Sequence, residues 1–164
     1  MGDQTQQQLA NHLEQVRHEL KGLELEHFDE QDAWQLGTWL RDAALERGYP
    51  IVIDIRQGDA PLFSVMLPGA TVANFDWARR KRNLCLLIGQ SSWELSLEKR
   101  LGTDFVELMG LSQRDYTPHG GCVPIRVAGV VGIVATVTIS GLPQQQDHEF
   151  AVEGLSALRQ IHEG

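Results

Sequence analysis

The sequence predicts an α+β domain built on an antiparallel sheet of four or five strands. Three observations lead to this prediction: strand-like segments arrive in hairpins, helix-like segments separate the hairpins, and the 164 residues have the length of one domain. A doubly wound parallel fold does not fit, because its strands alternate singly with helices. We therefore expect residues 1–164 to form a single domain, with residues 1–6 as a mobile tip.

The first expected helix covers residues 5–21. Its apolar residues recur at alternating spacings of four and three, which predicts a narrow seam suited to packing on one other helix. The seam consists of Leu9, Leu13, Val16, Leu20 and Leu23. The partner helix could belong to the same chain or to another subunit, and the spacing does not distinguish these alternatives.

Further helices are marked by residues that begin and end helices. Asp29 and Asn74 are good N-cap residues, and Ser91 with Glu94 forms a capping box. Glycines stop most of these helices. The expected ranges are 29–48, 74–88, 91–102, 104–111 and 143–162.

Two hairpins provide the expected strands. Residues 51–56 alternate isoleucine with other residues, and a turn at 57–60 leads to a return strand at 62–67. The second hairpin is expected at 122–127 and 130–139. Residues 23–26 also alternate and could add an edge strand.

Composition and charge exclude several classes of protein. A net charge of −8 disfavours nucleic acid and anionic membranes as partners. The longest apolar run, residues 127–139, is shorter than the roughly 20 residues that span a bilayer. The polar N-terminus is unlike a signal peptide, and two cysteines without a CxxC pair predict neither a disulfide scaffold nor a metal site. The default expectation is a cytoplasmic protein.

The one dense basic run, residues 79–82, lies on the third expected helix. Helical projection places Lys81 on the apolar stripe with Trp77, whereas Arg79 points away. A lysine in that position must extend to solvent, pair with a carboxylate or meet an anionic ligand. Arg79 and Arg82 share a turn and could grip a carboxylate or phosphate, although such runs are also common as solvated surface charge.

Two short segments carry further candidate ligand-binding residues. In His119-Gly120-Gly121, the glycines allow close backbone approach and the histidine can titrate, donate a hydrogen bond or ligate a metal; the alternative is a turn that requires glycine. Asp147 and His148 open the well-patterned part of the last helix. A buried Asp147 would need a cation, with Lys81 and Arg79 as candidates, whereas an exposed one would simply favour the helix dipole.

A series of motifs along the chain resembles a known family. In order, these are residues 77–83, 91–92, 116–121, 123–125, 129–132 and 140–148. Together they resemble the haem-degrading domain family, the GlcG/HbpS-like group, in the branch called uncharacterised protein family 0303. The similarity spans nearly the whole chain and is most specific between Asn74 and His148. Motifs for nucleotide binding, a nucleophile elbow and a zinc protease are absent from the sequence.

The resemblance implies a profilin-like α/β/α sandwich around a five-stranded antiparallel sheet, and assembly into homo-oligomers. The family name implies haem binding or degradation. We therefore expect an oligomer that binds a small anionic ligand, with haem or another anionic tetrapyrrole as the lead candidate. We place the pocket between the third helix, the Gly120–Gly121 loop and the start of the last helix. As our own hypotheses, His119 and His148 are candidate ligands, and Arg79 and Lys81 could meet propionates.

Two other functions compete with this one. The sandwich could be a non-catalytic assembly or adaptor protein that docks other proteins on its surface. It could also be an enzyme that uses Asp147, His148 and Arg79 on a small acid, provided that these groups lie within hydrogen-bond reach. The sequence leaves open whether any reaction is catalysed.

Overall fold

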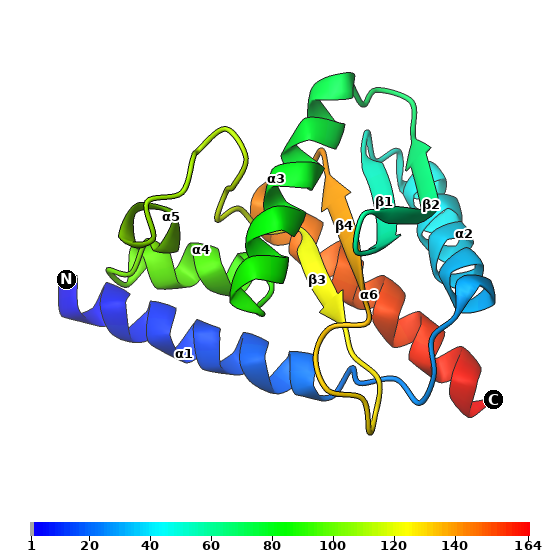
Figure 1. Ribbon diagram of the computed structural model, residues 1–164, viewed down its shortest axis with the longest axis horizontal. Helices are drawn as coiled ribbons and strands as arrows, with labels where there is room; N and C mark the ends of the chain where they lie inside the picture. Colours follow the sequence, from blue (N-terminus) through cyan, green and yellow to red (C-terminus); the bar gives the residue numbers. More distant parts are fainter. Residues whose placement is uncertain (1) are drawn as a thin grey trace.

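One antiparallel sheet with strand order β2-β1-β4-β3 organises the computed structural model, which describes the backbone of residues 2–164 and the side chains from residue 5 (Figure 1). The strands are β1 (Val52–Gln57), β2 (Ala60–Met66), β3 (Cys122–Ile125) and β4 (Ala135–Ser140). The helices are α1 (Gly2–Lys21), α2 (Glu30–Arg47), α3 (Val72–Ile88), α4 (Ser92–Arg100), α5 (Phe105–Leu108) and α6 (Gln144–Glu163).

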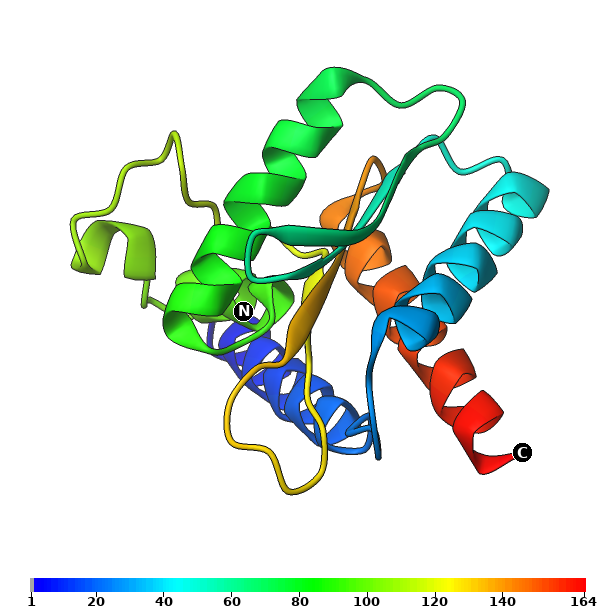
Figure 2. The same cartoon turned by 45° about the vertical axis from the view of Figure 1, so that its right-hand side comes forward.

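Helices cover both faces of the sheet. Helices α2 and α6 pack together on one face and α3 lies across the other, as the turned view shows (Figure 2). Helix α4 lies at the β3 edge, and α1 runs alongside α4. This arrangement confirms the prediction of an α+β fold with an antiparallel sheet. Within residues 2–164, no helix is both long and apolar enough to cross a membrane.

The prediction of five strands is wrong, because the described residues contain four. The segment expected as an edge strand makes only one isolated bridge, in which Leu25 pairs in parallel with Val127. The Leu25 amide donates to the Arg126 carbonyl at 2.9 Å, and the Ala128 amide donates back to Leu25 at 2.9 Å. The chain then turns away to begin α2 at Asp29, so the pairing cannot extend.

Several predicted boundaries also move, among them the end of the helix expected at 104–111, which stops at Leu108; two of the shifts have a clear local cause. Helix α3 starts after Thr71, not at Asn74, because Asn74 occupies the third helical position and accepts a 2.8 Å hydrogen bond from the Thr71 amide. Strand β4 starts at Ala135, not at residue 130, because Gly129 and Gly132 have φ angles of 78° and 87° that break an extended conformation. Of the tip expected to be mobile, residue 1 lies outside the described residues and α1 includes residues 2–6.

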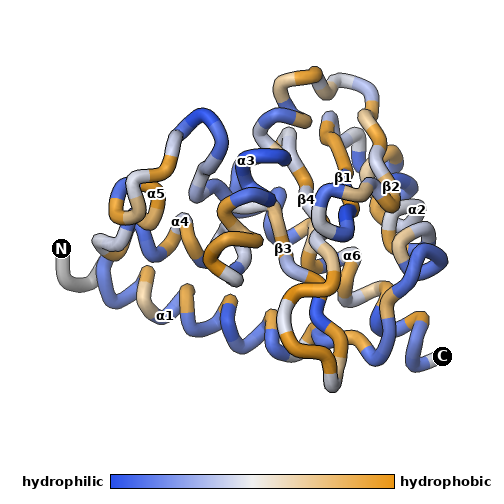
Figure 3. Tube along the Cα trace, viewed as in Figure 1, coloured by the Kyte–Doolittle hydropathy of each residue, from blue (hydrophilic) through white to orange (hydrophobic). Residues whose placement is uncertain are grey.

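The seam of α1 packs inside the chain. Leu13 and Val16 are buried against Trp93 and Leu97 of α4, so the partner helix belongs to the same chain. Figure 3 shows the apolar positions of α1 on the side that faces α4. This contact extends the domain beyond the sandwich.

The two faces of the sheet differ sharply in polarity. The face beneath α2 and α6 is apolar, with Ile53, Ile55 and Val137 in one continuous core. The close packing of α6 on α2 there requires Gly154, since a Cβ at this position would lie 2.6 Å from Leu40. The core therefore holds two helices and one sheet face together by hydrophobic burial.

The face beneath α3 is buried but polar. It carries Asp54, Cys122, Thr136, Thr138 and Ser140, each at most 3% exposed. Arg82 of α3 donates to Asp54 Oδ2 at 2.9 Å, and Arg56 of β1 donates to the same carboxylate at 2.9 Å. Because buried charges are costly unless they are paired, the contact between Arg82 and Asp54 fixes the position of α3 on the sheet.

Replacement of Asp54 by alanine should lower the free energy of unfolding by about 3–5 kcal/mol, because it leaves the Arg82 guanidinium buried without its partner. Urea denaturation measures this change. Asp42→Ala is the matched control, since Asp42 pairs with Arg41 at the surface and its loss should cost less than about 1 kcal/mol. A cost for Asp54→Ala as small as that of the control would contradict the assigned role.

Candidate functional site

A cavity of about 380 Å³ lies between α3, the loop before β3 and the start of α6. Trp77 and Lys81 line it from α3, His119 from the loop, and Gln144 and Asp147 from α6. The lining therefore combines an aromatic ring, an imidazole and an ion pair. Its volume is in the range of small-molecule sites.

Lys81 and Asp147 form a buried ion pair at the base of this cavity. Lys81 Nζ lies 3.0 Å from Asp147 Oδ2 and donates to the Ile139 carbonyl at 3.1 Å. The other oxygen of Asp147 accepts a 2.9 Å hydrogen bond from the Leu142 amide. Both side chains are at least 96% buried. Of the alternatives for Lys81, the structure shows pairing with a carboxylate.

Burial dominates the electrostatics of this pair. It raises the pKa of Asp147 to about 6, and the nearby charge of Lys81 only partly offsets the effect. Burial also lowers the pKa of Lys81, in spite of the opposing contribution from Asp147. The loss of hydration is thus the larger influence on both groups.

His119 is held as a neutral imidazole at the rim of the cavity. Burial, followed by the positive charge of Lys81, lowers the pKa of His119. Its Nδ1 forms a hydrogen bond with the Thr117 hydroxyl, and its ring meets Trp77 edge-on at a centroid distance of 5.3 Å. Within residues 5–164, no side-chain or backbone group bonds to its Nε2. That nitrogen keeps a lone pair available for a ligand whenever the proton is on Nδ1.

A second cavity, of about 230 Å³, shares Trp77 and His119 with the first. Arg80 and Lys99 line it and provide positive charge, and Asp104 lines it with a carboxylate oxygen 3.8 Å from Lys99 Nζ. The Arg80 guanidinium lies 4.2 Å from the Trp77 ring centroid and donates to the Gln113 carbonyl. The two cavities together place an aromatic surface and an imidazole next to two cations.

The glycines of the loop serve close packing. A Cβ on Gly120 would lie 2.6 Å from the Gln144 carbonyl oxygen. A Cβ on Gly121, whose φ is 141°, would lie 2.3 Å from the Ile139 carbonyl oxygen and 2.8 Å from Lys81 Nζ. The Gly120 amide also donates to Gln144 Oε1 at 3.0 Å. Glycine is therefore required for the loop to reach α6 and leave space for the lysine.

Arg79 and His148 lie away from the cavity that contains Lys81, His119 and Asp147. Arg79 bonds to Asp76 and Asp115 on the outer side of α3. The structure therefore does not bring Arg79, Asp147 and His148 together as one set of reacting groups. Sequence reasoning did not single out Thr117, Gln144 and Lys99 as site residues. Thr117 and Gln144 lie inside the motif segments 116–121 and 140–148, but their contacts with His119 and Gly120 arise only in the folded chain.

His148 lies on the other side of α6, beside Trp93 and a cavity that His12 also lines. Its side chain is buried, and neither ring nitrogen has a hydrogen-bond partner among the described residues. Burial, with a smaller contribution from His12, lowers the pKa of His148 to about 3. The folded protein thus keeps this ring neutral.

The low pKa of His148 predicts that the folded protein loses stability in acid. Unfolded His148 takes up a proton below about pH 6.5 and folded His148 does not, so stability falls as the pH decreases through this range. Between pH 7 and pH 4, the wild-type protein should lose about 3 kcal/mol more unfolding free energy than His148→Leu. Urea denaturation at both pH values tests this, with exposed His18→Leu as the control that behaves like the wild type. Equal losses in wild type and His148→Leu would refute the assignment.

Comparison with known proteins gives consistent matches. Residues 28–156 match the family described as haem-degrading protein HbpS-like. A UPF0303 protein of Acidobacterium capsulatum is 46% identical, over 92% of this chain and 91% of its own length. Another UPF0303 protein, from Azotobacter vinelandii, is 42% identical over 92% of this chain and 90% of its own.

Solved structures share the fold. The Ybr137w protein superposes with a TM-score of 0.85 at 32% identity, covering 93% of this chain and 90% of that one. A Streptomyces reticuli HbpS double mutant gives 0.64 at 21% identity, covering 80% and 87% of the two chains. A PduOC–haem complex gives 0.67 at 20% identity, covering 79% and 94%. The last two identities are low enough that they support the fold alone.

Proposed function

Because this chain belongs to the HbpS-like family of haem-degrading proteins, in its UPF0303 branch, we propose that it binds haem or another anionic tetrapyrrole. The family name supplies the ligand class, and one protein with this fold has been crystallised with haem. We place the ligand at the two cavities that share Trp77 and His119.

The observation that carries this proposal is the state of His119. A neutral imidazole is what a haem iron binds, and His119 has a lowered pKa and an Nε2 without a partner among the described residues. The Thr117 hydroxyl at Nδ1 orients the ring, as partners of metal-bound histidines commonly do. His119 would therefore hold the iron of such a ligand, and Thr117 would orient the imidazole ring.

The surroundings of His119 also suit an anionic macrocycle. Trp77 offers an aromatic ring with the Arg80 guanidinium over it, and Arg80 carries positive charge for carboxylates. Lys99 is a second cation at this cavity, 51% exposed and 3.8 Å from Asp104 Oδ2, so a ligand carboxylate would compete with Asp104 for it. Lys81 is already paired with Asp147, so in this proposal it links α3 to α6 beneath the ligand and does not bind propionates itself. Arg79 has no part in it, because Asp76 and Asp115 take its donors. When bound, an iron porphyrin would supply redox chemistry, and the chain would supply orientation and charge.

Titration of the purified protein with hemin tests this proposal. The Soret band should shift on binding, and His119→Ala should abolish the shift or weaken binding at least about tenfold, since it removes the imidazole that would hold the iron. His18→Ala is the matched control, because His18 is an exposed histidine on α1. An unchanged Soret shift and affinity in His119→Ala would refute the site.

We also propose that the chain assembles into a homo-oligomer through the loop between β3 and β4. The seam on α1 is used inside the chain, so it no longer suggests a subunit interface. In contrast, Val130 and Val131 at the loop tip are 51% and 101% exposed, and Figure 3 shows this loop as an apolar projection. Exposed apolar surface of this kind is typical of contacts with another protein.

Replacement of both valines by serine should reduce the sedimentation coefficient to that of a smaller species, because it removes apolar surface from the proposed contact. Sedimentation velocity of the wild type and of Val130→Ser/Val131→Ser measures the change. Val72→Ser is the control, since Val72 is 77% exposed at the start of α3 and lies on a different element. The same oligomer in the double variant and the wild type would rule out this loop as the interface.

A further inference from the structure

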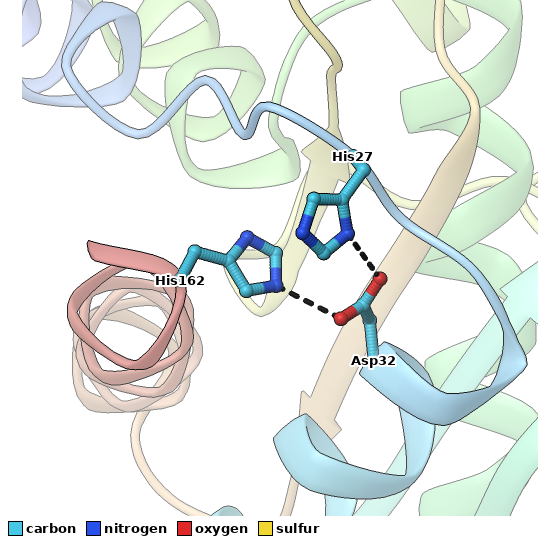
Figure 4. A group of neighbouring side chains, drawn as sticks. All are labelled: His27, Asp32 and His162. Carbon is cyan, nitrogen blue, oxygen red and sulfur yellow. Dashed lines mark hydrogen bonds and ion pairs between the residues drawn. The ribbon is translucent and has the colours of Figure 1, made fainter. Parts of the chain in front are cut away.

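Two histidines and one aspartate from separate segments converge at one place outside the cavities described above. Figure 4 shows His27, from the connection between α1 and α2, and His162, from the last turn of α6, both pointing toward Asp32 in the first turn of α2. Neither the proposed ligand site nor the apolar core uses them. Sequence reasoning could not group them, because His162 lies 130 positions from Asp32.

The three side chains already have close contacts. His27 Nδ1 lies 2.9 Å from one oxygen of Asp32, and His162 Nε2 lies 2.8 Å from the other. The imidazole rings stack with their centroids 3.9 Å apart and their planes at 24°. One potential ligand atom from each residue lies within 4.8 Å of the other two. An ion bound to all three atoms would displace the protons that now lie between the two ring nitrogens and the carboxylate.

The chemistry of the donors suits a divalent transition metal. Two imidazole nitrogens and a carboxylate oxygen form a donor set that zinc accepts, with water completing the coordination. Asp32 is anchored, because it accepts a 2.9 Å hydrogen bond from the Asp29 amide.

Access and local charge also favour a cation. His27 has a side chain that is 63% exposed, so an ion can reach the cluster from solvent. A cavity of about 310 Å³ beside His162 is lined by three glutamates and a single arginine: Glu24, Glu26, Glu163 and Arg159.

We propose that His27, Asp32 and His162 bind a divalent transition-metal ion, with zinc as the reference ion. Each imidazole gives its metal-facing nitrogen to the ion and carries its proton on the other nitrogen, and Asp32 contributes a carboxylate oxygen. The ion joins the connection before α2, the start of α2 and the end of α6. The site is independent of the tetrapyrrole proposal, since it shares no residue with it.

Isothermal titration calorimetry with zinc chloride tests the proposal on the full chain, after chelator treatment and removal of any affinity tag. The expected result is one zinc ion per chain, with affinity reduced at least about tenfold in His27→Ala and in His162→Ala. With free zinc at 100 times the dissociation constant of the wild type, the melting temperature should rise by roughly 5–10 °C in the wild type and by about half of that or less in His27→Ala and His162→Ala. Circular dichroism checks that each variant is folded.

Two control variants make the result specific. His18→Ala removes an exposed histidine on α1, and His119→Ala removes the histidine of the tetrapyrrole site; both should keep wild-type zinc affinity and the rise in melting temperature. His27 is exposed, so His27→Ala should fold even if His162→Ala does not. Zinc affinity in folded His27→Ala equal to that of the wild type, or no zinc binding by the wild type, would overturn the proposal.

Discussion

Paired charges between α3 and the structures beneath it determine where the candidate ligand site lies. Arg82 meets Asp54 on the sheet, and Lys81 meets Asp147 at the start of α6. Since an unpaired charge in these positions would be strongly destabilising, α3 has little freedom to shift along or rotate over the sheet. The Trp77 ring, on the same helix, is thereby held next to His119. The cavity is a consequence of this docking.

The two faces of the sheet contribute to the fold in different ways. Hydrophobic burial beneath α2 and α6 supplies a large, non-directional contribution to stability. The polar face beneath α3 relies on directional contacts, which define a single arrangement but tolerate few substitutions. Polar groups at the edge of that face can serve a ligand because the opposite face already provides the core.

Local sequence signals predicted the elements well and their tertiary partners poorly. The capping box at Ser91 and the projection of Lys81 onto the buried side of α3 both agree with the structure, because each depends on neighbours within a few residues. The prediction of a fifth strand was wrong, because the alternation of apolar and polar residues at 23–26 does not determine how many residues can pair with a neighbouring strand. The sequence also did not predict that Asp147 and His148 face different cavities. Asp147 contacts Lys81 of α3 and His148 contacts Trp93 of α4, and both contacts depend on the tertiary fold.

The bridge between Leu25 and Val127 joins two parts of the chain that otherwise belong to different layers. Its two hydrogen bonds tie the connection between α1 and α2 to the base of the projecting loop before β4. A shift of this loop at its base would have to break these two hydrogen bonds or move Leu25 with it. Leu25 lies two residues before His27, so the bridge joins the position of the loop to the position of that imidazole.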